Sequence, residues 1–220
     1  MKFDWATDWP VFVGAIGETL WIVALALGIG GLIGLLIGLT LFSTRPGGIG
    51  ENKFVYTALN VLVNFVRPIP FIIFLAAAQP ITKLIVNTTI GNEAFVVPAV
   101  IMCAFATSRI VEQNLVAIDP GVIEAARSMG ASPLRILRTV VVPEALGPLV
   151  LGYAFLFVAV TDMSALAGTI GGGGLGNFAL VYGYQRFDSV ATWITVVTIV
   201  VIVQVVQFLA NALARKIMRR

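Results

Sequence analysis

Two ionisable side chains interrupt long apolar runs of this 220-residue sequence, Arg67 in NFVRPIPF and Asp162 in AVTDMSALAG. A charged group within a bilayer-length apolar segment is costly, so it indicates a partner or a function. A carboxylate at position 162 can bind the ammonium group of a solute or pair with Arg67, and the sequence favours neither. Arg67 also has a structural interpretation, because Pro68 and Pro70 break a helix and free carbonyls that an arginine can satisfy.

The residues around Asp162 form a candidate solute path or gate, which consists of Asp162, Met163, Ser164 and Leu166. If the helix continues, Leu166 lies one turn beyond Asp162 on the same face. Two such leucines facing each other across a twofold axis would close a pore by excluding water. Ordinary core packing explains these residues at least as well.

A charged stretch punctuated by Gly and Pro, EAARSMGASPLRILRTVVVPEAL, occupies residues 124–146. Asp119 precedes it as a helix N-cap, and Pro120 stands at the favoured first helical position. Gly130 is a typical residue to end a helix in a left-handed conformation. Ser132 and Pro133 repeat the start signal, and Pro143 interrupts. Residues 119–143 therefore predict two short helices joined by a tight turn, which on pattern alone fits a surface hairpin equally well.

The sequence offers little for catalysis or cofactor binding. It has no histidine and one cysteine, Cys103, so His/Cys metal sites and an internal disulfide are unsupported. The run GGGGLG at 171–176 fits G-x-G-x-x-G, but no strand is predicted before it, and no G-x-x-x-x-G-K-[ST] is present. We expect no enzyme activity and no cofactor in this chain. The run is interpreted as a flexible external turn, or alternatively as a hinge or close-packing point.

The composition is that of an integral membrane protein: 59% of residues are hydrophobic and 11% are charged. A span needs about 20 mainly apolar residues. We predict an all-α protein with five transmembrane helices, near residues 19–42, 55–79, 94–117, 147–168 and 190–213. The remaining parts would be an external N-terminal segment at 1–18, the loop at 119–143 and a basic tail at 214–220.

Positive charges orient the five-span arrangement, because cytoplasmic loops carry an excess of Lys and Arg. Three bases fall on the side of the N-terminus: Lys2, Lys83 and Arg186. Ten fall on the other side: Arg45, Lys53, Arg109, Arg127, Arg135, Arg138, Arg215, Lys216, Arg219 and Arg220. The N-terminus is therefore predicted outside, and the 119–143 loop and the C-terminus are predicted to be cytoplasmic.

The first predicted span carries glycines at every fourth position: Gly30, Gly34 and Gly38. Small residues at this spacing share one helix face and allow close approach of another helix. The pattern fits general packing within the bundle, and alternatively a dedicated dimer seam.

The 119–143 loop resembles the EAA loop of ABC importer permeases, which reads EAA, three residues, Gly, nine residues and I-x-L-P. The matching residues are Glu124, Ala125, Ala126, Gly130 and Pro143, and valines at 140 and 142 replace Ile and Leu. The resemblance implies a type I importer fold in which the first short helix, the coupling helix, docks on a cytoplasmic ATPase. Glu124 and Arg127 would offer polar contacts there, and Ala125 and Ala126 would allow close approach.

Five further segments, VRPIPFIIFL, TTIGNEAFVVP, SALAGTIGGGGLGNFALVYGYQRF, RSMGASPLRILR and IVVIVQVVQFLANALARKI, resemble permeases of methionine ABC importers over residues 14–213. This resemblance implies a homodimer in the bacterial inner membrane, joined to two copies of an ATPase that binds ATP and Mg. A solute-binding protein or lipoprotein would deliver the solute, and nucleic acid would have no part. Methionine is the substrate implied, and another amino acid or small solute is the alternative.

Two other function classes compete with an importer. An ion-driven secondary transporter predicts inverted repeats and several charges at the membrane midplane, whereas five spans do not divide into equal halves and few charges are present. A structural membrane anchor leaves Asp162 unexplained.

Overall fold

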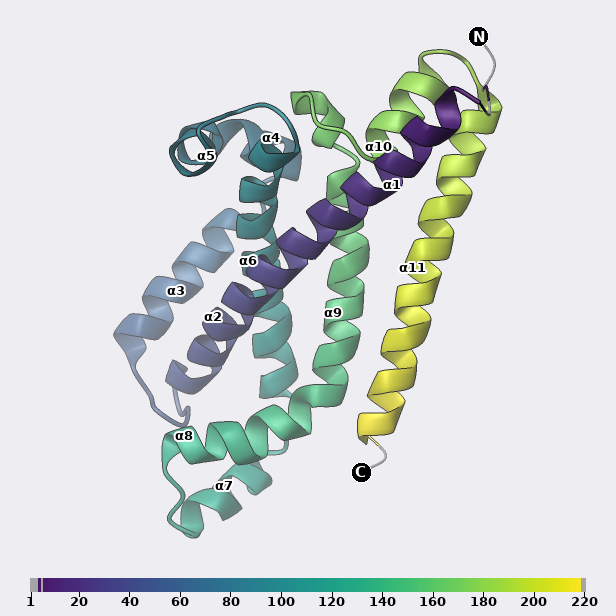
Figure 1. Ribbon diagram of the computed structural model, residues 1–220. Helices are drawn as coiled ribbons and strands as arrows, with labels where there is room; N and C mark the ends of the chain where they lie inside the picture. Colours follow the sequence, from purple (N-terminus) through teal and green to yellow (C-terminus); the bar gives the residue numbers. More distant parts are fainter. Residues whose placement is uncertain (1–3, 5, 219–220) are drawn as a thin grey trace.

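The computed structural model describes residues 4 and 6–218, and within that part of the chain all regular structure is helical. The prediction of an all-α protein is confirmed (Figure 1). The α-helices are α1 (Asp8–Leu25), α2 (Gly31–Thr44), α3 (Lys53–Val66), α4 (Phe71–Ala77), α5 (Gln79–Val86), α6 (Asn92–Val116), α7 (Pro120–Ser128), α8 (Pro133–Ile136), α9 (Val142–Ser164), α10 (Leu175–Phe178) and α11 (Ser189–Met218). Three π-helical turns, Ala26–Gly30, Leu137–Val141 and Ala179–Tyr184, and one 3₁₀ helix, Ala167–Ile170, lie between them.

Four helical stretches of the described chain are long and apolar enough to cross a membrane: Asp8–Thr44, Asn92–Val116, Pro133–Ser164 and Ser189–Met218. Helices α3 and α4 pass the same test only as a pair, and they are bent by 107°. The predicted number of five spans is reached when this bent pair counts as one.

The first helix begins at Asp8, so most of the predicted N-terminal segment 1–18 is already helical. Pro10 lies in the first turn, where a helix tolerates proline because the N–H has no partner there. Phe12 is buried, and its ring lies 5.2 Å from that of Phe178. Packing against Phe178 therefore extends the helix well beyond the predicted span 19–42.

The second predicted span, 55–79, consists of α3 and α4, and the helix breaks at Pro68 and Pro70, as the sequence indicated. The last backbone hydrogen bonds of α3 run from the Arg67 N–H to the Val63 carbonyl and from the Ile69 N–H to the Val66 carbonyl. Pro68 and Pro70 supply no N–H, so the helical ladder ends there and the chain turns into α4.

The fourth span starts earlier than predicted, since one helical stretch runs from Pro133 to Ser164. Pro143 does not end it. A π turn, Leu137–Val141, precedes the proline and accommodates the hydrogen bond that Pro143, which has no N–H, cannot make. The helix changes direction there, between α8 and α9 (Figure 1). The third helix agrees with its predicted range, and α11 continues through residues 214–218 of the predicted tail.

Helix α6 lies inside the bundle, with α2, α3 and α9 around it (Figure 1). The three spaced glycines of the first span meet it: a Cβ at Gly30 or Gly38 would come within 3.0 Å of Cys103 or Val111. The glycine pattern therefore serves packing within one chain.

The two ends of the bundle are distinct. Helix α7 and the C-terminus lie at one end, and the N-terminus, α5 and α10 lie at the other (Figure 1). This arrangement agrees with the expected distribution of loops, while the membrane orientation stays a prediction. Three of the bases used for it, Lys2, Arg219 and Arg220, lie outside the described residues.

We predict that Gly34→Ala destabilises the protein by about 1–3 kcal/mol, the usual cost of overpacking. The added methyl group would press against the Ala104 carbonyl and the Thr107 side chain. Gly17→Ala is the control, because no atom lies within 4 Å of its added Cβ. Thermal unfolding in detergent should show a lowered midpoint for Gly34→Ala only; equal midpoints would refute the tight α2–α6 contact.

Candidate functional site

Helix α7 is fixed at both ends by its own sequence. The Asp119 carboxylate accepts a hydrogen bond from the Gly121 N–H at 2.8 Å, as the predicted N-cap requires. Gly130 has φ +76°, so its predicted left-handed conformation is confirmed. The N–H of Gly130 bonds the Arg127 carbonyl and that of Ala131 bonds Ala126, which together form a Schellman motif.

One face of α7 packs on the bundle and the other is open. Ile123 and Ala126 are buried in a core cluster with Phe42, so Ala126 is not available to a partner, contrary to our expectation. Glu124 and Ala125 are exposed. The open face offers a carboxylate and a small side chain, which suits close approach by another protein.

Arg127 connects α7 to the loop between α2 and α3. Its guanidinium donates to the Gly48 carbonyl at 2.7 Å. Glu124 and Arg127 also line a small hollow of about 80 Å³ together with residues of this loop. The sequence placed Arg127 at a partner interface, and the structure also uses it to brace the loop.

The second half of the loop differs from the predicted hairpin. Ser132 occupies the N-cap position of α8, but its side chain makes no capping bond. Pro143 is exposed and lies within the first turn of α9. A continuous helical path therefore joins the α7 turn to α9.

Asp162 lies near the end of α9, two residues before its last residue, Ser164. It is 20 residues beyond Val142, about 30 Å along the helix from the α7 end. The next N–H groups, of Ala165 and Leu166, bond three residues back to Asp162 and Met163, so the regular α-helix stops. The predicted shared face of Asp162 and Leu166 does not apply.

The four candidate path residues have different surroundings. Ser164 is buried and donates to the Thr161 carbonyl, and Leu166 packs against a core cluster. Asp162 is exposed in the single chain, and Met163 is half-buried. Asp162 is therefore the most open of the four, Met163 and Leu166 are half-buried, and Ser164 is closed off.

Arg67 and Asp162 are not brought together. Arg67 caps the C-terminus of α3 and is exposed. Neither side chain forms an ion pair with any residue among 4 and 6–218. Within one chain, the structure does not show the proposed pair.

Sequence reasoning missed a polar cluster between α3 and α6. Arg109, which we counted as a loop base, lies inside α6 with only 18% of its side chain exposed. It pairs with Glu112 and donates to the Oδ1 atoms of Asn60 at 2.8 Å and Asn64 at 2.7 Å. The available signal was the spacing of Asn60 and Asn64, which puts two amides on one helix face.

The glycine run at 171–176 is closely packed and not a loose turn. The N–H of Gly173 donates to Asn92 Oδ1, that of Gly174 to Glu18 Oε2, and that of Leu175 to Thr19 Oγ1. A Cβ at Gly173 would collide with the Glu18 carboxylate. These contacts tie the loop to α1 and α6 and occupy the N–H groups that a phosphate would need.

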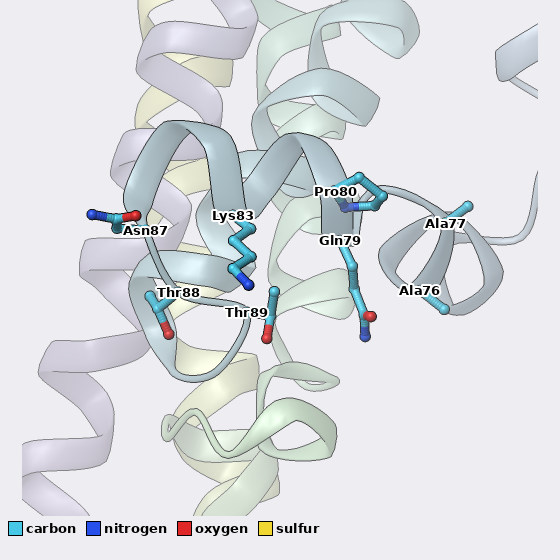
Figure 2. Close-up of a pocket in the computed structure, with 8 residues that line it drawn as sticks. All are labelled: Ala76, Ala77, Gln79, Pro80, Lys83, Asn87, Thr88 and Thr89. Carbon is cyan, nitrogen blue, oxygen red and sulfur yellow. The ribbon is translucent and has the colours of Figure 1, made fainter.

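A polar hollow of about 690 Å³ opens at the end opposite α7. Figure 2 shows the side chains of Gln79, Lys83 and Thr89 extending to the same side of the α4–α5 ribbon. Lys83 is exposed and forms no ion pair with the described residues. The hollow therefore offers one lysine ammonium group among amide and hydroxyl side chains.

The membrane-length helices and the exposed capped helix at one end are features of a multi-span membrane protein with a surface open to contact by another protein. Residues 30–219 match the family described as the binding-protein-dependent transport system inner membrane component, and the chain belongs to that family.

The sequences of individual relatives align with most or nearly all of this chain. The chain is 38% identical to a probable D-methionine transport system permease protein of Vibrio cholerae, over 99% of both chains. It is 37% identical to a methionine import system permease protein of Bacillus subtilis, over 82% and 81% of the two chains. A solved structure of the MetNI methionine ABC transporter in inward-facing conformations superposes with a TM-score of 0.93, at 36% identity and 98% and 99% coverage.

We predict that Gly130→Val misplaces α7 without affecting membrane insertion. A left-handed conformation costs a residue with a Cβ about 1–2 kcal/mol, and β-branched side chains resist it most. No atom lies within 4 Å of a Cβ at this position, so only backbone strain is tested. The measurement is the amount of permease in the membrane and of ATPase that co-purifies with it; we expect normal insertion and weakened association.

Gly130→Asn is the matched control, because asparagine tolerates the left-handed region. It should retain the ATPase better than Gly130→Val. If both variants retain it like the parent, the conformation of Gly130 does not position the docking helix.

Proposed function

We propose that this chain is the permease subunit of an ATP-driven importer in a bacterial inner membrane, working as a homodimer. Two ATPase subunits would supply the energy from the α7 side, with ATP and Mg bound in those subunits. A solute-binding protein or lipoprotein would deliver the solute at the opposite end. Family membership supports this assembly, as does the likeness to the MetNI transporter.

The observation that carries the proposal is the open face of α7. It projects from one end of the bundle and is rigid, because Asp119 caps its start and Gly130 ends it. Its inner face is anchored in the core by Ile123. A short helix fixed on one side and exposed on the other can pass a displacement of a docked ATPase to the spans.

The proposed substrate is methionine. Support comes from the relatives in Vibrio cholerae and Bacillus subtilis, whose names specify methionine, and from the MetNI likeness. Another amino acid is the alternative, because a solved amino acid ABC transporter has the same fold at 23% identity. We also propose that the structure corresponds to the inward-facing arrangement of its solved relative.

Reconstitution tests this function directly. The permease, its ATPase and its binding protein are placed in liposomes, and uptake of a panel of amino acids is measured with and without ATP. We expect ATP-dependent accumulation of methionine ahead of the other amino acids. ATP-dependent uptake of a different amino acid would change the substrate, and uptake driven by an ion gradient alone would refute the importer.

Glu124 is proposed to contact the ATPase, and Asp162 with Met163 is proposed to line the path. Support for the second assignment is the exposure of Asp162 in a single chain, since a carboxylate at the end of α9 must meet water or a partner.

We predict that Asp162→Asn lowers uptake at least about tenfold, the equivalent of one charged contact. Assembly with the ATPase should remain normal. Glu124→Lys is the contrasting variant, which should lose ATPase association; parental uptake with Asp162→Asn would remove Asp162 from the path.

A further inference from the structure

Helix α3 has three faces of different chemistry. Val63 and Val66 are buried against the bundle. Phe54 and Phe65, which are 83% and 72% exposed, form an apolar face. At 100° per residue, four polar side chains of α3 and that of its C-cap, Arg67, fall within about 80° of the circumference. They form the polar stripe, which consists of Lys53, Thr57, Asn60, Asn64 and Arg67.

The polar stripe lies at membrane depth. Helix α3 runs beside α2 and α6 from the α7 end of the bundle to the bend before α4 (Figure 1). Its 14 residues cover about 21 Å, more than half of the hydrocarbon thickness. Amide and guanidinium groups at that depth do not face lipid tails, whereas the phenylalanine face can. The polar stripe must therefore meet water, solute or protein.

Arg109 on α6 orients the middle of the stripe. It holds the Oδ1 atoms of Asn60 and Asn64, and Asn64 Nδ2 also donates to Asn60 Oδ1 at 3.2 Å. With their oxygens occupied, the two amides keep free N–H donors. Glu112 compensates the Arg109 charge, so the cluster is nearly neutral. The middle of the stripe can therefore exchange hydrogen bonds with water and zwitterions without presenting an uncompensated charge.

We infer that the polar stripe of α3 lines the water-filled inner half of the solute path, with Arg109 fixing its two asparagines. The inference rests on the proposed permease function and identifies one surface that lines the path. The solute class that fits is a small zwitterion, which exchanges hydrogen bonds with amides and hydroxyls as it moves. The stripe extends from Lys53, next to the α7 end, to Arg67 at the bend. It therefore covers the part of the path that an inward-facing permease opens.

Cysteine accessibility tests this inference in the assembled complex. Thr57→Cys and Asn64→Cys lie on the polar stripe, and Ala58→Cys and Phe65→Cys lie one residue away on the apolar face at matched depth. Native Cys103 is buried and serves as the blank. Each variant complex is first shown to transport in liposomes. The same complex in nanodiscs is then treated with a permanently charged methanethiosulfonate, and the labelled fraction of this chain is followed by mass spectrometry.

We expect the two stripe positions to react at least about tenfold faster than their neighbours, because hydrocarbon excludes a charged reagent. Equal rates, faster labelling at Ala58→Cys or Phe65→Cys, or no labelling at either stripe position would overturn the inference. Thr57→Cys makes no contact with Arg109, so it decides the matter if Asn64→Cys does not assemble. A parent complex that fails to transport would instead refute the proposed function, whatever the labelling.

Discussion

Three glycines on one face of the first span bring the backbone of α2 against α6, and this contact sets the positions of the other spans. With α2 seated there, α6 can meet α9 through Gly152, whose Cβ would collide with Ile110, and α3 through Arg109. The first residue of α6, Asn92, also accepts a hydrogen bond from the Gly173 N–H and so holds the glycine run. In a bilayer, hydrophobicity does not drive helices together, so close backbone approach and interhelical hydrogen bonds must supply the attraction. Helix α6 collects both kinds of contact, which explains why it is the most buried of the spans.

The α7 loop depends on local chemistry more than on the bundle. Its start and stop follow from Asp119, Pro120 and Gly130, each of which satisfies a backbone requirement on its own. Burial of Ile123 then turns the helix so that Glu124 and Ala125 face outward. The same turn buries Ala126. The two alanines thus have different surroundings, since Ala126 packs internally and Ala125 is exposed, and spacing alone does not separate them.

Prediction from the sequence succeeded where the signal was local or a long apolar run. The all-helical class, the α7 caps and the α6 range follow from composition and capping residues. Prediction failed where contacts between residues far apart in the sequence determine the structure. The extension of α1 to Asp8 depends on Phe178, and the burial of Arg109 depends on two asparagines 45 and 49 residues away. Hydropathy extended the fourth span to residue 168, because it does not register that α9 ends at Ser164 and that a 3₁₀ helix begins at Ala167. The glycine run looked loose because Glu18 and Thr19, its hydrogen-bond acceptors, lie far away in sequence.

The α7 helix has two physical connections to the proposed path, and they reach different walls. Through the chain, Pro133 begins a helical stretch that ends at Ser164, so displacement of α7 acts on the helix carrying Asp162. The π turn before Pro143 replaces regular α-helical bonds in that stretch, at the place where the helix bends. Through space, Arg127 bonds the Gly48 carbonyl in the loop that leads to Asn52, the N-cap of α3. A docked partner that moves α7 would therefore pull on the start of the polar stripe and on α9 together. Helices α3 and α9 both also pack on α6, so that helix is the common support against which such a movement would act.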